Sequence, residues 1–308
     1  MVAAASMAAR NRPQAEDLRL PVHGTARMNN RTRELIAFTF LRLSALIVVL
    51  PIALIICLLV IQGAPALSLK FLFSYPSEGM RAGGIFPAIV GTIYLVLGTI
   101  VFAVPLGVMA AVYLSEYARP NALTRLIRLS IVNLAGVPSI VYGLFGFGIF
   151  VLLLGFGVSL LAGSLTLALL VLPVVIVAAE EALLSVPQTF REASLALGAT
   201  KWQTIRRVVL PNALPGVITG VVLAIARAAG ETAPILFTVA AFYLPRLPRS
   251  IFDQAMALPY HLFIMSTQVP NAPPGIQWGT ALALLIIVLG MNLIAAVIRA
   301  RFRRRRPW

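Results

Sequence analysis

The 308-residue sequence has few charged residues and very few thiol or imidazole side chains. Charged residues make up 11% of the chain and hydrophobic residues 60%, which is far from the composition of a soluble domain. The single cysteine, Cys57, excludes an intrachain disulfide. The two histidines, His23 and His261, are far apart and unsupported by cysteines, which argues against a metal site. This composition indicates an integral membrane protein.

Motifs for ATP hydrolysis and for nucleophilic catalysis are also missing. A Walker A loop needs a lysine followed by Ser or Thr, but Lys70 precedes Phe71 and Lys201 precedes Trp202. The chain has no Gly-x-Ser-x-Gly elbow. We therefore expect a chain that is not an enzyme and that binds neither a cofactor nor a metal itself.

Long apolar runs are what the sequence does contain. Six of them can cross a hydrocarbon core about 30 Å thick, which takes roughly 20 residues. They lie near residues 35–61, 85–114, 126–155, 158–184, 213–244 and 276–298. We therefore predict an all-α polytopic membrane protein with six transmembrane helices. Its parts are a basic, mostly disordered tail (1–34), a first transmembrane helix (35–61), a core of five helices (85–298) and a basic tail (299–308).

The distribution of positive charge predicts the orientation of these spans. Lys and Arg are concentrated in both tails and in the loops near 115–130 and 185–211, which together hold 19 of these residues. The opposite loops hold four. Because positive loops stay on the cytoplasmic side, we expect both termini to be cytoplasmic. The net charge of +15 therefore reflects membrane topology and contact with anionic headgroups, and does not indicate a nucleic-acid partner.

The cytoplasmic loop 185–211 carries its own helix signals. Thr189 followed by Glu192 fits a capping box, and Gly198 is suited to end this short helix in a left-handed conformation. Thr200 followed by Gln203 fits a second capping box. We therefore predict two short helices with a sharp turn at Gly198.

The second of these helices is amphipathic. Trp202, Ile205 and Val209 share one face, and Pro211 marks where we expect the helix to give way to the membrane. Taken alone, such a segment is typical of a helix that lies in the membrane interface.

The spacing within the loop resembles the EAA motif of ATP-binding-cassette importer permeases. That motif reads E-A-A, three residues, G, nine residues and I-x-L-P; here "EAS" lies at 192–194, Gly198 follows, and "VVLP" lies at 208–211. Ser194 and Val208 depart from the motif but preserve size and helical fit. The resemblance implies an ABC importer type I permease fold, in which the loop docks on an ATPase subunit. It assigns that coupling role to Glu192, Ala193, Ser194, Gly198, Leu210 and Pro211.

Three other segments resemble the A-type permease subunit of the phosphate importer. They are residues 91–118, "LAGVPSIVYGLFG" at 134–146 and "AIARAAGETAPILFT" at 224–238. The resemblance implies a complex with a C-type permease subunit, two ATP-binding subunits that use ATP and Mg, and an extracytoplasmic phosphate-binding protein. Inorganic phosphate would be the transported substrate.

Arg227 and Glu231 lie one helical turn apart inside the fifth predicted span. A charged residue near the bilayer centre costs about 2.5 to 3.5 kcal/mol on insertion scales, whereas an i,i+4 pair returns only about 0.2 to 0.5 kcal/mol. We therefore expect Arg227 to face a path and bind a passing oxyanion, with Glu231 as its competing partner. A structural ion pair is the alternative. Thr232 either lines the same path or bonds back to its own helix.

Two other functions fit the same residues. One is a permease of this superfamily that carries another oxyanion. The other is a membrane subunit that mainly signals phosphate status, for which transport would remain intact when only the response is lost. The sequence also leaves open whether the permease pairs with a different chain or with a copy of itself.

Overall fold

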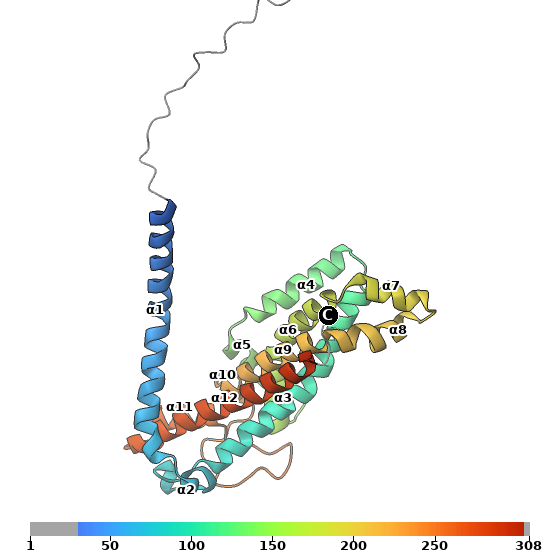
Figure 1. Cartoon of the computed structure of the whole chain (residues 1–308). Coiled ribbons are helices and arrows are strands. Elements are labelled where there is room, and N and C mark those ends of the chain that lie inside the picture. The colour runs from blue at the N-terminus through green and yellow to red at the C-terminus, as the bar shows by residue number, and fades with distance from the viewer. Residues whose placement is uncertain (1–29, 305–308) are drawn as a thin grey trace, which may run out of the picture. The chain divides into compact units, whose positions relative to one another are not determined.

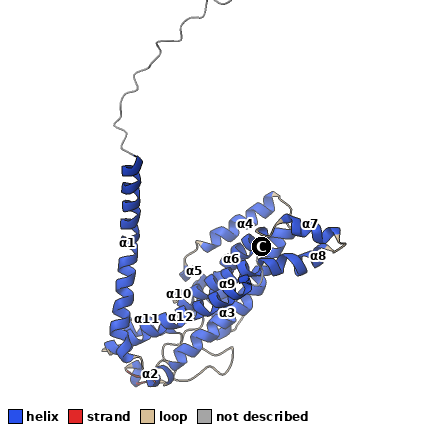
Figure 2. Cartoon of the chain, viewed as in Figure 1, coloured by secondary structure: helices blue, strands red, loops and turns tan. Residues whose placement is uncertain are grey.

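The computed structural model describes residues 30–304, and almost all regular structure in this range is helical (Figure 1, Figure 2). The prediction of an all-α chain is confirmed, with one short ladder between β1 (Pro76–Ser77) and β2 (Ala82–Gly83) added. The chain divides into two compact units, one ending at Ile56 and one beginning at Cys57. Most of the predicted N-terminal tail and the last four residues lie outside the described residues.

In the described range, the first unit consists of most of helix α1 (Asn30–Gly63). This helix contains the first predicted span, and its large apolar side chains from Leu35 onward are exposed. Pro51 lies inside it without ending it. A long apolar helix with an exposed surface is suited to contact lipid.

Four long helices form the body of the second unit: α3 (Phe86–Val112), α6 (Leu160–Leu184), α9 (Leu210–Gly230) and α12 (Pro274–Arg304). They run side by side in Figure 1, where α6 packs against both α3 and α9, and α9 packs against α12. Helix α6 is the most buried of the long helices described. The membrane-spanning core is therefore organised around α6.

Shorter elements connect the long helices. Before α3 these are η1 (Ala64–Ala66), α2 (Leu69–Phe73) and η2 (Glu78–Met80); before α12 lies α11 (Leu258–Thr267). Within residues 30–304 there are also three π-helical segments: η3 (Tyr113–Tyr117), η4 (Phe147–Leu153) and η5 (Ile205–Val209). Such segments each insert an extra residue into a helix and often lie at functional sites.

The third predicted span is not one straight helix. It divides into α4 (Ala122–Ala135) and α5 (Ser139–Gly146), which η4 continues, and the two parts are bent by 103°. Pro138 lacks a backbone N–H and disfavours a helical conformation at Val137 before it, which explains the break. The described residues therefore contain five helices that can span a membrane, or six if the bent pair counts as one.

Candidate functional site

The fifth predicted span is also broken, and the break falls at the charged pair. Helix α9 ends at Gly230, Glu231 follows with extended backbone dihedrals (φ −74°, ψ 134°), and a new helix, α10 (Ala233–Thr238), begins two residues later. The prediction of one helix over 213–244 is therefore wrong. Pro234 cannot donate a hydrogen bond to the carbonyl of Gly230, so the α9 ladder cannot continue through this point.

Arg227 and Glu231 approach one another across the end of α9. The Nε of Arg227 lies 3.4 Å from Oε1 of Glu231, and the two side chains are 32% and 18% exposed. Within residues 30–304, the two terminal nitrogens of Arg227 have no hydrogen-bond acceptor. The ion pair is therefore a long contact through one nitrogen only. It leaves the two terminal nitrogens of the guanidinium free to bind an oxyanion.

Thr232 occupies the N-cap position of α10, but its side chain makes no capping bond. It is half-buried and follows Glu231 directly. A Cβ placed at the neighbouring Gly230 would meet no atom within 4 Å, so this side of the break is open. Arg227, Glu231 and Thr232 are thus brought together at one open helix break.

The second broken helix lies against the first. Adding a Cβ to Gly143 of α5 would place it 3.0 Å from both the carbonyl oxygen of Ala233 and the Cα of Pro234, so α5 packs closely on α10. Tyr142 is buried in a cluster with Ala224 and Ala228 of α9. Irregular backbone at membrane depth is tolerated where it is buried in protein or lines a wet cavity, and here two irregular segments meet beside Arg227.

Tyr142 was not a predicted site residue, and it connects the two halves of the bent pair. Its hydroxyl donates a hydrogen bond of 2.9 Å to the carbonyl oxygen of Leu134 on α4. The same carbonyl also accepts the backbone N–H of Val137 over 3.1 Å, so the tyrosine adds a second donor at the end of α4. The position of α5 beside the charged pair is therefore tied to α4.

The loop 185–211 forms the two expected short helices. They are α7 (Gln188–Ala196) and α8 (Lys201–Thr204), separated by a turn in which Gly198 has φ +82°. The capping box of Thr200 and Gln203 is present, with both reciprocal hydrogen bonds. The predicted turn at Gly198 and the second capping box are confirmed.

Two details of the loop differ from prediction. Pro187, not Thr189, is the N-cap residue of α7, which makes no side-chain capping bond; because the fixed φ of proline sets the start of the helix, Thr189 falls inside the first turn. Pro211 does not separate the second helix from the membrane. The helix runs from α8 through η5 into α9 without a break, and Pro211 lies in the first turn of α9, where proline is tolerated.

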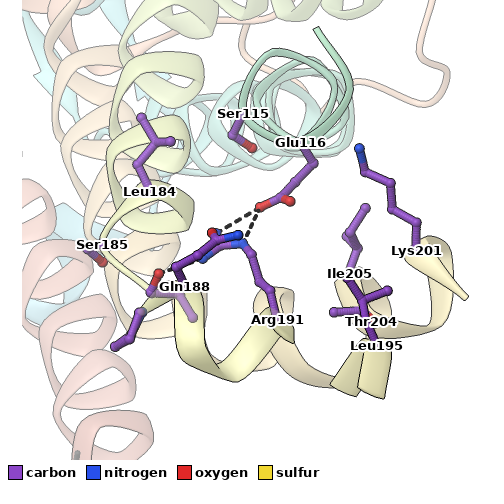
Figure 3. Close-up of a pocket in the computed structure, with 12 residues that line it drawn as sticks. Ser115, Glu116, Leu184, Ser185, Gln188, Arg191, Leu195, Lys201, Thr204 and Ile205 are labelled. Atoms are coloured by element: carbon purple, nitrogen blue, oxygen red, sulfur yellow. Dashed lines mark hydrogen bonds and ion pairs between the residues drawn. The ribbon is translucent and has the colours of Figure 1, made fainter. Parts of the chain in front are cut away.

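The face of α7 toward the protein is anchored by Arg191. Its Nη2 and Nε lie 2.8 Å and 3.2 Å from Oε1 of Glu116 on η3, and it also donates to the carbonyl oxygens of Leu183 and Val186. The Arg191 and Glu116 side chains are only 12% and 9% exposed. Figure 3 shows Arg191 pointing toward Glu116. Both residues line a cavity of about 630 Å³. Sequence alone did not reveal this pair, because its members are 75 positions apart.

Further contacts hold the loop around the same cavity. Lys201 lies over the ring of Tyr117, 4.8 Å from its centroid, and the hydroxyls of Ser194 and Thr204 are 2.9 Å apart. Leu210 packs against a buried cluster that joins α3, α6 and α9. Leu210 therefore attaches the loop to the protein, the Ser194 bond joins α7 to α8 within the loop, and Pro211 lies in the first turn of α9.

The opposite face of α7 is open. Glu192 and Ala193 are exposed, and the side chain of Leu197 next to Gly198 is 90% exposed. Of the three residues predicted to share one face, Trp202 is 56% exposed, whereas Ile205 and Val209 are buried. A firmly anchored loop with an exposed acidic and apolar tip is suited to dock on another protein.

Comparisons with known proteins place the chain in a defined context. Residues 103–306 match the family described as binding-protein-dependent transport system inner membrane component. The chain is 40% identical over 287 residues to "Phosphate transport system permease protein PstA 1" of Mycobacterium tuberculosis, covering 91% of this chain and 92% of the relative. It is 39% identical over 300 residues to "Phosphate transport system permease protein PstA" of Mycobacterium leprae, with 96% of each chain covered.

The fold has solved counterparts. A chain of a bacterial ABC transporter involved in the import of the acidic polysaccharide alginate superposes with a TM-score of 0.63 at 14% identity. The superposition covers 88% of this chain and 96% of that chain. This likeness confirms the predicted ABC importer permease architecture of the helical core.

Proposed function

The chain belongs to the binding-protein-dependent transport system inner membrane components, among the phosphate transport permease proteins, and we propose that the break between α9 and α10 is its phosphate path. The chain is thus a permease subunit of a phosphate importer, and the path is the part of that function which the geometry supports. The observation that carries the proposal is an arginine with two open nitrogens at an open helix break.

The energetics favour a transport role for Arg227 over a structural one. A charge at membrane depth costs about 2.5 to 3.5 kcal/mol, and an i,i+4 pair in a regular helix returns about 0.2 to 0.5 kcal/mol. At 3.4 Å and through Nε alone, the contact with Glu231 is weaker than a bidentate one. Stability alone therefore does not explain the pair.

Glu231 acts as the release partner. Phosphate near neutral pH is a mixture of mono- and dianion, and a cluster of arginines would hold it too firmly for transport. A single guanidinium with a competing carboxylate beside it gives a weak, transient site. High affinity then resides in a separate extracytoplasmic phosphate-binding protein, and Thr232 supplies a hydroxyl to the same path.

Coupling takes place at the exposed face of α7. Glu192, Ala193 and the tip at Leu197 and Gly198 dock on an ATP-binding subunit. Behind this face Ser194 joins α7 to α8, Leu210 packs on the core, and Pro211 lies in the first turn of α9. ATP and Mg bind to two such partner subunits, and this chain holds no cofactor and performs no catalysis. A C-type permease subunit completes the path, and closure of the ATPases switches the bundle between inward and outward access.

The chain is an inner membrane component, and we place both termini in the cytoplasm. The excess of Lys and Arg in the tails and in the loop that contains α7 supports this orientation. It puts α7 on the side where ATP is available, and it puts α11 and the loop after α10 on the side of the binding protein.

The test of the path is the Arg227→Gln variant in the reconstituted complex. We expect phosphate uptake to fall by at least tenfold while ATP hydrolysis continues. The reason is that the variant loses roughly one charge-assisted hydrogen bond, which contributes about 1.5 to 3 kcal/mol. Arg125→Gln, which removes an exposed arginine of α4, is the matched control. Near-normal uptake by Arg227→Gln would exclude the proposed role.

Glu231→Gln gives the complementary result. Because the competing carboxylate is removed, we expect phosphate to be retained longer and the uptake rate to fall, although Arg227 is intact. Competition by sulfate and arsenate in the same assay identifies the oxyanion. A complex that loses only the cellular phosphate response, with uptake intact, would support the signalling function instead.

A further inference from the structure

The π-helical segment η3, at the end of α3, receives an arginine from each of two neighbouring elements. Arg191 of α7 binds the Glu116 carboxylate, and Arg128 of α4 donates to the carbonyl oxygen of Leu114 over 2.9 Å. We infer that Arg191 and Arg128 are positioning residues that join the coupling loop to α4 through η3. This inference rests on the proposed function, because it describes how movement of α7 reaches the helix break at Arg227.

The first link is built for rigidity. Arg191 uses its guanidinium fork on one carboxylate oxygen and on two backbone carbonyls at the end of α6, and it is almost fully buried. A lysine has a single ammonium on a flexible stem and cannot reproduce this set of bonds. In the close-up (Figure 3), Arg191 and Glu116 point toward one another from different elements. Movement of α7 is therefore transmitted to η3.

The second link attaches a helix that is largely exposed. Thr124 is the only buried residue of α4. Besides its bond to Leu114, Arg128 lies 2.7 Å from Oε1 of Glu180 on α6, and the Glu180 side chain is 12% exposed. The middle of α4 is thus attached to η3 and α6 through one side chain.

The far end of α4 leads to the charged pair. The carbonyl of Leu134 accepts the hydroxyl of Tyr142, and α5 packs through Gly143 on the first turn of α10. The contacts therefore run without a gap from α7 to η3, then to α4 and α5, and finally to the residues that follow Glu231. A π-helical turn has a less regular hydrogen-bond ladder than an α-helix, so η3 is a natural place for a register change along this line.

The experiment uses the complete reconstituted complex and measures phosphate uptake and ATP hydrolysis together. We expect Glu116→Gln, Arg128→Gln and Arg191→Lys each to lower the phosphate transported per ATP by about 2- to 30-fold, the range found when residues along a coupling network are changed. Glu181→Gln and Arg125→Gln, which change exposed neighbours, should leave this ratio unchanged. A fall in uptake that only follows the amount of assembled complex would overturn the inference.

A second measurement does not depend on phosphate. In a Cys57→Ser background, spin labels at Thr189 of α7 and Val132 of α4, both exposed, report the distance between the two helices. We expect a narrow distance distribution that nucleotide leaves unchanged in the otherwise wild-type complex, and a broad, nucleotide-dependent one in Glu116→Gln. Equal distributions in both would refute the link.

The two measurements separate the inference from the function on which it rests. If the wild-type complex moves no phosphate, the proposed function is wrong. The distance measurement still tests whether α7 and α4 are joined through η3. If wild-type uptake is normal but the ratio and the distances are unaffected by the variants, the link fails alone.

Discussion

Gly146, on the face of α5 that packs against α6, tests whether this contact sets the position of the bent pair. A Cβ added there would lie 2.1 Å from Oγ1 of Thr166, 2.7 Å from its Cγ2 and 2.9 Å from its Cβ. Thr166 is buried and its hydroxyl is bonded to Ala162, so it cannot turn away. In Gly146→Ala the two helices must therefore separate by roughly 1 Å, since ordinary contact begins near 3.4 Å.

The expected cost follows from this overlap. Overpacking of a close contact lowers the free energy of unfolding by about 1 to 3 kcal/mol. Replacing glycine by alanine in a helix raises it by up to about 1 kcal/mol. Gly148→Ala is the matched control, because a Cβ at Gly148 would meet nothing within 4 Å. The propensity gain is similar at both positions, so the difference between the two variants isolates the packing cost.

The assay is thermal or denaturant unfolding of the purified subunit in detergent. We expect Gly146→Ala to unfold at a clearly lower temperature than Gly148→Ala, and the latter to match or exceed the wild type. Equal stability of the two variants would refute the packing of α5 on α6, and with it the placement of the bend beside Arg227.

Three further predictions concern the loop and helix α11. Gly198→Ala should destabilise the α7–α8 turn by about 1 to 2 kcal/mol, because φ is +82° there; faster proteolysis between α7 and α8 would show it. Thr200→Ala should cost about 0.5 to 2 kcal/mol through loss of the capping box, with the same readout and Thr189→Ala as the control. In α11, outside the membrane-spanning helices, burial lowers the pKa of His261 to about 4 from 6.5. The His261 imidazole therefore binds a proton more readily in the unfolded chain than in the folded one. The free energy of unfolding should fall by about 2 to 3 kcal/mol as the pH falls from 6.5 toward 4. The His261→Leu variant should not show this pH-dependent fall.

Much of the helical architecture could be predicted because hydrophobic length is a local signal. The apolar runs at 35–61, 158–184 and 276–298 each correspond to part or all of a long helix. Gly198 and the Thr200 capping box were predictable for the same reason, since turn chemistry depends on neighbours in the chain. In contrast, Pro51 and Pro173 lie within continuous helices, whereas Pro138 and Pro234 lie at breaks. Tertiary packing decides between these outcomes, and hydropathy does not report it.

The site was only partly accessible from sequence. Arg227 and Glu231 were found because charge at membrane depth is unusual, but their separation by a helix end depends on how α10 packs on α5. Glu116 and Arg191 form the most buried ion pair among the described residues, and their partnership is set by the fold across 75 positions. The role of a buried arginine such as Arg191 is recognisable only after its distant acceptor is known.

The most direct measurement of the central claim is ATP-dependent uptake of radiolabelled phosphate by proteoliposomes that contain the complete complex and its binding protein. We predict uptake that requires this chain, persists in excess sulfate and is lost in Arg227→Gln while ATP hydrolysis continues. Uptake that is unchanged without this chain, or that Arg227→Gln leaves intact, would contradict the account.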